Sequence, residues 1–325
     1  MATSLNVALL GATGETGSSI MKGLINSTEP RYNITALARP ASVDKPALLA
    51  FKEQGVKIVA VDLDGSAIDL AAALKGMDVV ISAIDAGHLL SQIPLANACK
   101  DAGVGRFVPC CFSTVTAPGV LNLQDLKDDV LDHIKHIHLP YTVIDVGWWY
   151  QSTLPRLPSG RTDYIASPSE LFILGDGNTP FALTDLGDIG LYTARIVCDK
   201  RTLNKSVFAF TEIKTQNEIY ATIEELSGET ATRNHLSADK LAGMIADVKA
   251  QKPAQNTPDF FKLAVLQYWR TWGLRGDNQP EYATYLGYLL ADELYPGLKG
   301  RPFTEYCKEV LEGKAHKVYE NVTFF

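Results

Sequence analysis

The sequence predicts an α/β protein built on a doubly wound parallel sheet, with a smaller, mainly helical domain in the second half. Three observations lead to this fold class. A glycine-rich loop joins the first apolar run to a helical pattern, strand and helix patterns then alternate through the first half, and the loops between them are short. This alternation is typical of parallel sheets that helices cover on both faces.

The chain opens with a strand, a glycine loop and a helix. Residues 6–10 (NVALL) predict a buried strand, and residues 11–17 (GATGETG) carry glycines at GxxGxxG spacing. We expect Gly11 to permit the tight turn, Gly14 to let the backbone approach a pyrophosphate, and Gly17 to let helix and strand pack closely. The phosphates would lie at the helix N-terminus, where unpaired amides and the helix dipole favour negative charge. This opening predicts a Rossmann-type dinucleotide-binding domain.

The remaining elements of the first half follow in regular order. The sequence predicts strands at 33–38, 57–61, 78–82, 106–109 and 141–145, and helices at 18–24, 47–54, 67–74, 92–102 and 123–137. Glycines near the helix-to-strand junctions support these boundaries, because glycine is favoured just after a helix. We expect residues 1–155 to form the NAD(P)-binding domain.

The second half is less regular. Its predicted elements are a strand-like run at 170–174, a turn at 175–177, and helices at 188–198, at 216–226 and from 238 onward. We expect residues 156–325 to form a substrate-binding domain, with some segments returning to the sheet.

Composition limits the classes of function. The chain has 325 residues, of which 46% are hydrophobic, which is enough for one large or two modest domains. The net charge of −7 argues against a nucleic-acid-binding surface. Five cysteines without a CxxC motif predict reduced thiols and a cytoplasmic protein. No apolar stretch is long enough to span a bilayer, so we expect no membrane partner.

The end of the second predicted strand bears on the choice of cofactor. An NAD-preferring site usually has Asp or Glu there, whereas this chain has Arg39, with Lys45 further along the loop. Because a guanidinium offers a bidentate fork to phosphate, we expect NADPH. A solvated arginine at a strand end is the alternative. Asp62, after the third strand, is placed to meet the adenine side, or is simply an acidic loop residue.

Ligands in open α/β sheets bind outside the carboxyl ends of the strands. The cofactor site is therefore expected to include residues of the glycine loop and of the loop after the fourth strand, namely Thr13, Glu15, Thr16, Ala83 and Ile84.

Residues after the fourth and sixth strands are candidates for substrate binding. Trp148, Trp149 and Tyr150 could form an aromatic wall for a flat, conjugated substrate, although packing at a domain interface would also explain them. His88 could contact substrate or cofactor, or be a loop histidine without a role.

Three histidines near the end of the helix at 123–137 raise the question of a metal site. His133, His136 and His138 lie where imidazoles interact favourably with the helix dipole. Because no acid or cysteine completes a ligand set, we expect no metal.

The sequence offers one candidate for proton transfer. The Tyr-x-x-x-Lys pair of common short-chain dehydrogenases is missing from the expected region. On the helix at 123–137, Lys127 lies at the edge of the apolar face. A lysine held there beside a nicotinamide could have a lowered pKa and act as general acid or base, although the two aspartates that follow it would oppose that lowering. A solvated helix lysine is the alternative.

A set of motifs along most of the chain bears on its family. They are residues 11–17, DVVIS at 78–82, Gln92, RFVP at 106–109, Lys127 with Val130 and Ile134, LPYT at 139–142, DIG at 188–190 and RTLNK at 201–205. Together they resemble the isoflavone reductase-like branch of the NmrA-like atypical short-chain dehydrogenases. The resemblance implies that Lys127 is the family's catalytic lysine and a cofactor contact, and that Phe112 is an aromatic residue near the nicotinamide. The family usually carries Ser and an acid where this chain has Cys110 and Cys111.

The resemblance also implies a function. We expect an NADPH-dependent oxidoreductase that reduces a small aromatic or conjugated carbonyl metabolite of secondary metabolism, with Lys127 moving the balancing proton. Two alternatives stay open. One is an NmrA-like protein that senses NADP and regulates a protein partner. The other is an isomerase, lyase or cyclase on the same fold, which the altered Cys110-Cys111 region favours. A homodimer is also left open.

Overall fold

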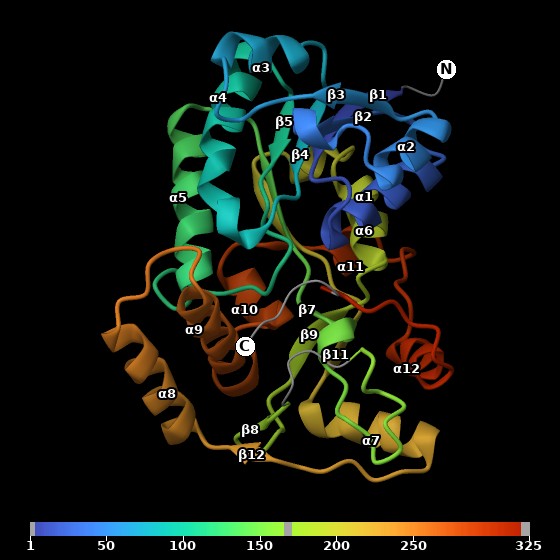
Figure 1. Cartoon of the computed structure of the whole chain (residues 1–325), viewed down its shortest axis with the longest axis vertical. Helices are drawn as coiled ribbons and strands as arrows, with labels where there is room; N and C mark the ends of the chain where they lie inside the picture. The colour runs from blue at the N-terminus through green and yellow to red at the C-terminus, as the bar shows by residue number, and fades with distance from the viewer. Residues whose placement is uncertain (1–3, 166–170, 320–325) are drawn as a thin grey trace. The chain divides into compact units, whose positions relative to one another are not determined.

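The computed structural model describes residues 4–165 and 171–319, and the chain forms two compact units (Figure 1). Unit 1 comprises the chain up to Phe112 together with Asp125–Asp145 and Gly187–Ala209. Unit 2 comprises Ser113–Gln124, Val146–Leu186 and the chain from Phe210 onward. The sequence predicted one boundary at residue 155 with later segments returning to the sheet. In the structure the chain passes between the units more than once, and Gly187–Ala209 is a segment of unit 1 that follows a segment of unit 2.

A parallel sheet forms the centre of unit 1, with five strands in the order β3-β2-β1-β4-β5. These strands are β1 (Leu5–Leu10), β2 (Tyr32–Ala38), β3 (Lys57–Ala60), β4 (Val79–Ser82) and β5 (Arg106–Val108). A parallel bridge between Phe107 and Tyr141 continues the sheet to β6 (Thr142–Asp145), which pairs in parallel with β10 (Lys205–Phe208). The doubly wound parallel sheet predicted from the sequence is confirmed.

Six helices flank this sheet: α1 (Glu15–Asn26), α2 (Pro46–Glu53), α3 (Ala67–Ala73), α4 (Gln92–Ala102), α5 (Asn122–His136) and α6 (Asp188–Ile196). Figure 1 shows α3, α4 and α5 on one side of the sheet and α1, α2 and α6 on the other. The first-half elements agree with the predicted ranges to within one residue, except that α1 begins three residues earlier and ends two residues later.

Helices α1 and α6 approach closely enough to require glycine. A Cβ on Gly190 would lie 1.9 Å from the carbonyl oxygen of Ser19, and a Cβ on Gly23 would lie 2.1 Å from that of Gly190. The Ser19 hydroxyl donates to the Gly187 carbonyl at 3.1 Å and accepts from the Gly190 amide at 2.9 Å. This contact explains why the segment that follows residue 186 packs within unit 1.

A buried arginine anchors the end of α6 to the sheet. The Arg106 guanidinium on β5 donates to the carbonyl of Ile196 at 2.9 Å, to the Thr202 hydroxyl at 2.9 Å and to the carbonyl of Asp199 at 2.7 Å. Because these oxygen atoms accept hydrogen bonds from a charged group away from water, they offset part of the cost of burying the arginine.

Unit 2 consists mainly of helices with short strands. Its helices are α7 (Gln216–Ser227), α8 (Ala238–Ala250), α9 (Pro258–Tyr268), α10 (Pro280–Tyr285), α11 (Ala291–Leu294) and α12 (Phe303–Leu311). Strands β11 (Glu212–Lys214), β9 (Phe181–Thr184) and β7 (Trp148–Trp149) form one small sheet, and β8 (Ile173–Leu174) pairs with β12 (His235–Leu236). The strand predicted at 170–174 is therefore shorter than expected, and Glu170 lies outside the described residues. Helix α7 begins with a capping box between Thr215 and Glu218.

Candidate cofactor and catalytic site

The three glycines of the loop after β1 have different roles. Gly11 has φ of +82°, and a Cβ there would lie 2.2 Å from the carbonyl oxygen of Ala83. A Cβ on Gly17 would lie 2.0 Å from the carbonyl oxygen of Gly11, so the fold itself requires both glycines. A Cβ on Gly14 would meet only the Gly11 carbonyl oxygen, at an ordinary 3.5 Å. The fold therefore does not require glycine at position 14.

The end of α1 at this loop fits a pyrophosphate. Gly14 is the cap residue of the helix and has no side chain that could cap its N-terminus. Thr13 and Gly14 are exposed, and Glu15 and Thr16 are half-buried. An uncapped helix end offers amide donors and a favourable dipole to an anion, and a side chain at position 14 would enter the space an anion needs.

Two cations lie at the same edge of the sheet. Arg39 follows β2 directly, and Lys45 precedes α2; both are exposed. Because β1 and β2 are parallel, Arg39 and the glycine loop lie at carboxyl ends of adjacent strands. Asp62 follows β3 at this edge and accepts a hydrogen bond from the Asp64 amide at 3.1 Å, so its carboxylate shapes a local turn.

The loop after β4 contacts the glycine loop through its backbone. The Ala83 amide donates to the Leu10 carbonyl at 2.9 Å, and Ile84, which follows, is half-buried. His88 is exposed, and its Nδ1 lies 2.8 Å from Oδ1 of Asp85. Of these residues, Ala83 is held firmly by the sheet, whereas His88 interacts with a neighbour in its own loop.

Lys127 is buried on α5, with 7% of the residue exposed. Its Nζ donates a hydrogen bond to the carbonyl oxygen of Cys111 at 2.8 Å. Cys111 lies in the loop after β5, at the carboxyl ends of the parallel strands, where the glycine loop also lies. The sequence placed Lys127 at the edge of an apolar helix face; the structure buries it and ties its amine to this loop.

Burial keeps the two thiols of this loop protonated. Burial raises the pKa of Cys110 to about 11, against an opposing effect of Lys127. Burial also raises the pKa of Cys111 well above its usual value, and Asp145 adds to that rise. Because the thiolate is the nucleophile, the raised pKa values disfavour nucleophilic chemistry at Cys110 and Cys111.

Hydrogen bonds of both backbone and side-chain groups fix the conformation of this loop. The Cys110 amide donates to Oε1 of Gln92 at 2.7 Å, and the Cys110 thiol donates to the Ile84 carbonyl at 3.1 Å. Phe112 is buried with φ of +39°, a left-handed conformation that is unusual for a bulky residue, and its amide donates to the Ile144 carbonyl at 2.8 Å. Gln92 was part of the sequence motifs but was not among the predicted site residues.

The predicted substrate-binding aromatics belong to unit 2. The half-buried Trp148 lies with its ring centroid 5.4 Å from that of Tyr268 and 5.6 Å from that of Trp272. Trp149 is also half-buried and stacks on Tyr319. Tyr150, in contrast, is a fully buried core residue that packs on the rings of Phe303 and Tyr306, and its hydroxyl donates to the carbonyl of Arg301. Trp148 and Trp149 therefore keep accessible surface, whereas Tyr150 does not.

The histidines of α5 do not come together with other metal ligands. His133 Nε2 lies 2.8 Å from Oδ1 of Asn97. In residues 4–165 and 171–319, no group of three or more His, Cys, Asp or Glu side chains is arranged to hold a metal ion. Within the same residues, no helix combines the length and the apolar content that a membrane span requires.

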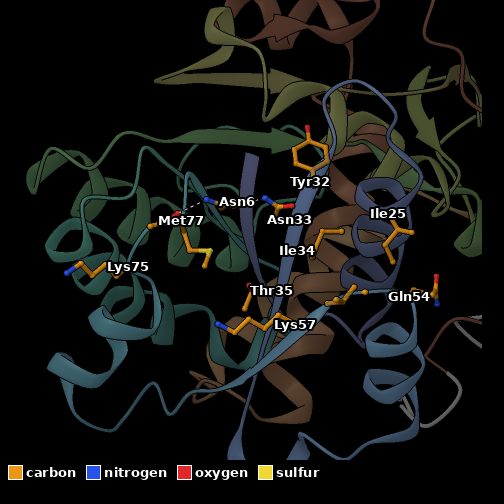
Figure 2. A pocket seen from close by; sticks show the side chains of 13 residues that line it. Asn6, Ile25, Tyr32, Asn33, Ile34, Thr35, Gln54, Lys57, Lys75 and Met77 are labelled. Atoms are coloured by element: carbon orange, nitrogen blue, oxygen red, sulfur yellow. Dashed lines mark hydrogen bonds between the residues drawn. The ribbon is translucent and has the colours of Figure 1, made fainter. Parts of the chain in front are cut away.

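A recess of about 580 Å³ lies at the other edge of the sheet in unit 1. Figure 2 shows its polar side chains, among them Asn6, Asn33 and Lys57 at the amino ends of β1, β2 and β3. Ligands of open α/β sheets bind at the carboxyl ends of the strands, so this recess is not the candidate cofactor site.

Comparison with known families and relatives gives consistent matches. The model of the NmrA-like family matches residues 3–264. The chain is 43% identical over 316 residues to the asnovolin J 5',6'-dehydrogenase nvfM of Aspergillus novofumigatus, covering 95% of this chain and 96% of that one. It is 30% identical over 330 residues to an isoflavone reductase-like protein of Olea europaea, covering 96% and 100%.

Solved structures share the fold. One described as pinoresinol-lariciresinol and phenylcoumaran benzylic ether reductases superposes with a TM-score of 0.77 at 26% identity, covering 95% of this chain and 99% of that one. Leucoanthocyanidin reductase of Vitis vinifera, solved with NADPH, also gives a TM-score of 0.77, at 24% identity, covering 94% and 99%.

Proposed function

This chain belongs to the NmrA-like family, and from that premise we propose that it is an NADPH-dependent oxidoreductase that reduces a small aromatic or conjugated carbonyl metabolite. The relatives that it resembles carry the names of reductases and dehydrogenases, which supports an enzyme rather than a regulatory sensor. The observation that carries the proposal is the buried amine of Lys127, held at the edge of the sheet where the glycine loop also lies.

The geometry of unit 1 supports the proposed cofactor contacts. The amides at the start of α1 would hold the pyrophosphate, with Gly14 leaving room for it. Arg39 and Lys45 would hold the 2'-phosphate, and Asp62 would face the adenine side. The loops that contain Ala83, Ile84 and Phe112 would border the nicotinamide. When bound, NADPH supplies the hydride.

Lys127 would supply the balancing proton. An ammonium has three N–H donors, and one of them is used by the Cys111 carbonyl. Another would donate to the substrate oxygen on which negative charge develops as the neighbouring carbon system receives the hydride. The N–H bond then breaks and an O–H bond forms, so the substrate gains two hydrogens in all. The hydrogen bond to Cys111 would hold Nζ in place during this transfer.

Aromatic side chains are the proposed substrate contacts. Trp148 and Trp149 keep accessible ring surface in unit 2, which suits a flat, conjugated molecule. His88 stays a candidate because it is exposed. The burial of Tyr150 favours a supporting role for that residue in the core of unit 2.

The reverse direction is a second candidate. The relative at 43% identity is named a dehydrogenase, so the same residues could remove hydrogen from a substrate with NADP+ as acceptor. Lys127 would then start unprotonated and accept the proton. A third outcome, isomerisation on the same fold, stays open.

Product mass separates these functions. The purified protein would be incubated with NADPH and a panel of enones, quinone methides and benzylic ethers, and with NADP+ and their saturated counterparts. A gain of two hydrogens supports reduction, a loss of two supports dehydrogenation, and an unchanged mass supports isomerisation. We also propose a cytoplasmic location, because all five cysteines are free thiols, and a homodimer stays a prediction.

A further inference from the structure

A buried carboxyl group lies at the end of β6. Asp145 is the last residue of this strand and only 2% exposed. Its carbonyl accepts from the amide of Ala209, which fixes the strand end beside β10. An ionised carboxylate removed from water is strongly destabilising unless a positive charge or hydrogen-bond donors compensate it. A compensating group is therefore expected close by.

Backbone geometry brings this strand end to the loop that holds Lys127. The amide of Phe112 donates to the carbonyl of Ile144 at 2.8 Å, so the loop after β5 runs beside the end of β6. The residue before Phe112 is Cys111, whose carbonyl accepts from Nζ of Lys127. The amine of Lys127 and the end of β6, which carries Asp145, therefore contact two adjacent residues of the loop after β5, namely Cys111 and Phe112.

The pKa values of the two thiols in this loop agree with that arrangement. Burial raises the pKa of Cys110 and of Cys111, Asp145 adds to both rises, and Lys127 opposes them. Electrostatic interactions weaken with distance, which supports the placement of both charges near this loop. The other charged groups that act there are Asp128, on Cys111, and Asp85, on Cys110.

We propose that Asp145 is the positioning residue of Lys127: its buried carboxylate balances the ammonium and keeps Lys127 protonated until the substrate oxygen takes the proton. The proposal rests on the proposed function, because it concerns the proton donor of that reaction. It assigns a role to the only acidic residue in a strand that is otherwise apolar or hydroxyl-bearing, TVID.

The experiment compares Asp145→Asn with Asp129→Asn. Both changes remove one negative charge, but Asp129 is exposed on the same helix as Lys127. Lysine labelled with ¹³C at Cε is titrated by NMR in the free protein, and the Lys127 signal is assigned by its loss in Lys127→Ala. Loss of an opposite charge at close range lowers the pKa of an amine by about one pH unit or more. The midpoint of the Lys127 titration should therefore fall by at least that amount in Asp145→Asn. Asp129→Asn should leave it unchanged.

The pH profile of kcat/KM gives a second readout. A general acid loses activity as it deprotonates. The alkaline limb of the profile should therefore shift to lower pH by the same number of pH units in Asp145→Asn, and it should stay at the same pH in Asp145→Glu. A structural role alone would lower the rate without moving the limb, and that result would overturn the proposal.

The unmodified protein still gives a decisive result if Asp145→Asn does not fold. A Lys127 that is unprotonated at neutral pH in the unmodified protein overturns the proposal without any variant. The NMR titration needs neither substrate nor cofactor. Absence of turnover on every conjugated substrate would therefore refute the proposed function while leaving this inference to be judged by the titration.

Discussion

The amine of Lys127 donates a hydrogen bond to the backbone carbonyl of Cys111, across 16 residues of sequence and 2.8 Å of space. This bond joins α5 to the loop after β5 and holds a buried amine at the carboxyl edge of the sheet. The account of the site depends on it, because a lysine free to turn toward water would be a surface charge with no fixed direction.

Gly14 and Gly17 should respond differently to alanine. Gly14→Ala should change the free energy of unfolding by no more than about 1 kcal/mol, because its Cβ meets one atom at an ordinary distance. It should nevertheless raise the Kd for NADPH at least tenfold, because the methyl group enters the space proposed for the pyrophosphate. Gly17→Ala should cost about 3 kcal/mol or more, because its Cβ would lie 2.0 Å from a carbonyl oxygen. Urea denaturation and NADPH titration measure these effects; unchanged affinity in Gly14→Ala would contradict the proposed phosphate site.

Arg39→Ala should weaken the binding of NADPH and leave that of NADH unchanged. A charged hydrogen bond to phosphate is worth about 1.5–3 kcal/mol, which corresponds to a loss of roughly tenfold or more in affinity. Arg31 precedes β2 at its amino end and is also exposed, so Arg31→Ala removes the same charge at the opposite edge and serves as control. Equal losses for both cofactors would show that Arg39 does not read the 2'-phosphate.

Lys127 and Asp145 should be coupled in stability. Lys127→Met leaves a buried carboxylate without its proposed counter-charge, and such losses cost about 3–5 kcal/mol. The double variant Lys127→Met with Asp145→Asn should recover much of that loss, because neither charge then remains. Chemical denaturation of the two single variants and the double variant completes a mutant cycle. Strict additivity would argue against the pairing.

Buried thiols should make the protein less stable at alkaline pH. Burial raises the pKa of Cys110 from 9.0 to about 11 and that of Cys307 from 9.0 to about 12. A group whose pKa is higher in the folded state stabilises that state fully below its unfolded pKa. The contribution is lost as pH rises through the folded pKa. The free energy of unfolding should therefore fall between about pH 9 and 12. Replacing Cys307 with Ala should make that fall shallower, and an identical slope would contradict the assignment.

Local patterns were sufficient to predict the parallel sheet and the helices of unit 1. The positions of the glycine loop and of Arg39 at the carboxyl edge could be predicted because they depend on neighbours within a few residues and on the direction of parallel strands. The depth of Lys127 could not be predicted, because helical spacing gives only the direction of a side chain. The loop that covers it comes from β5.

Two other residues show the same limit. Tyr150 lies in a short 3-10 turn, and its ring packs on Phe303 and Tyr306, about 150 residues later, which no local pattern reveals. Asp145 did carry a signal, since an acid that ends an apolar strand at the carboxyl edge of a sheet is unusual. The loop after β5, which lies beside Asp145 and contacts Lys127, could be identified only from the fold.

The most direct test of the account is turnover by Lys127→Ala on a substrate that the unmodified protein reduces. NADPH consumption and product mass would be followed together, with NADPH affinity measured in parallel. The account predicts a product that has gained two hydrogens, and a rate lowered by about 10²-fold or more in the variant while NADPH still binds. Undiminished turnover in Lys127→Ala would contradict it.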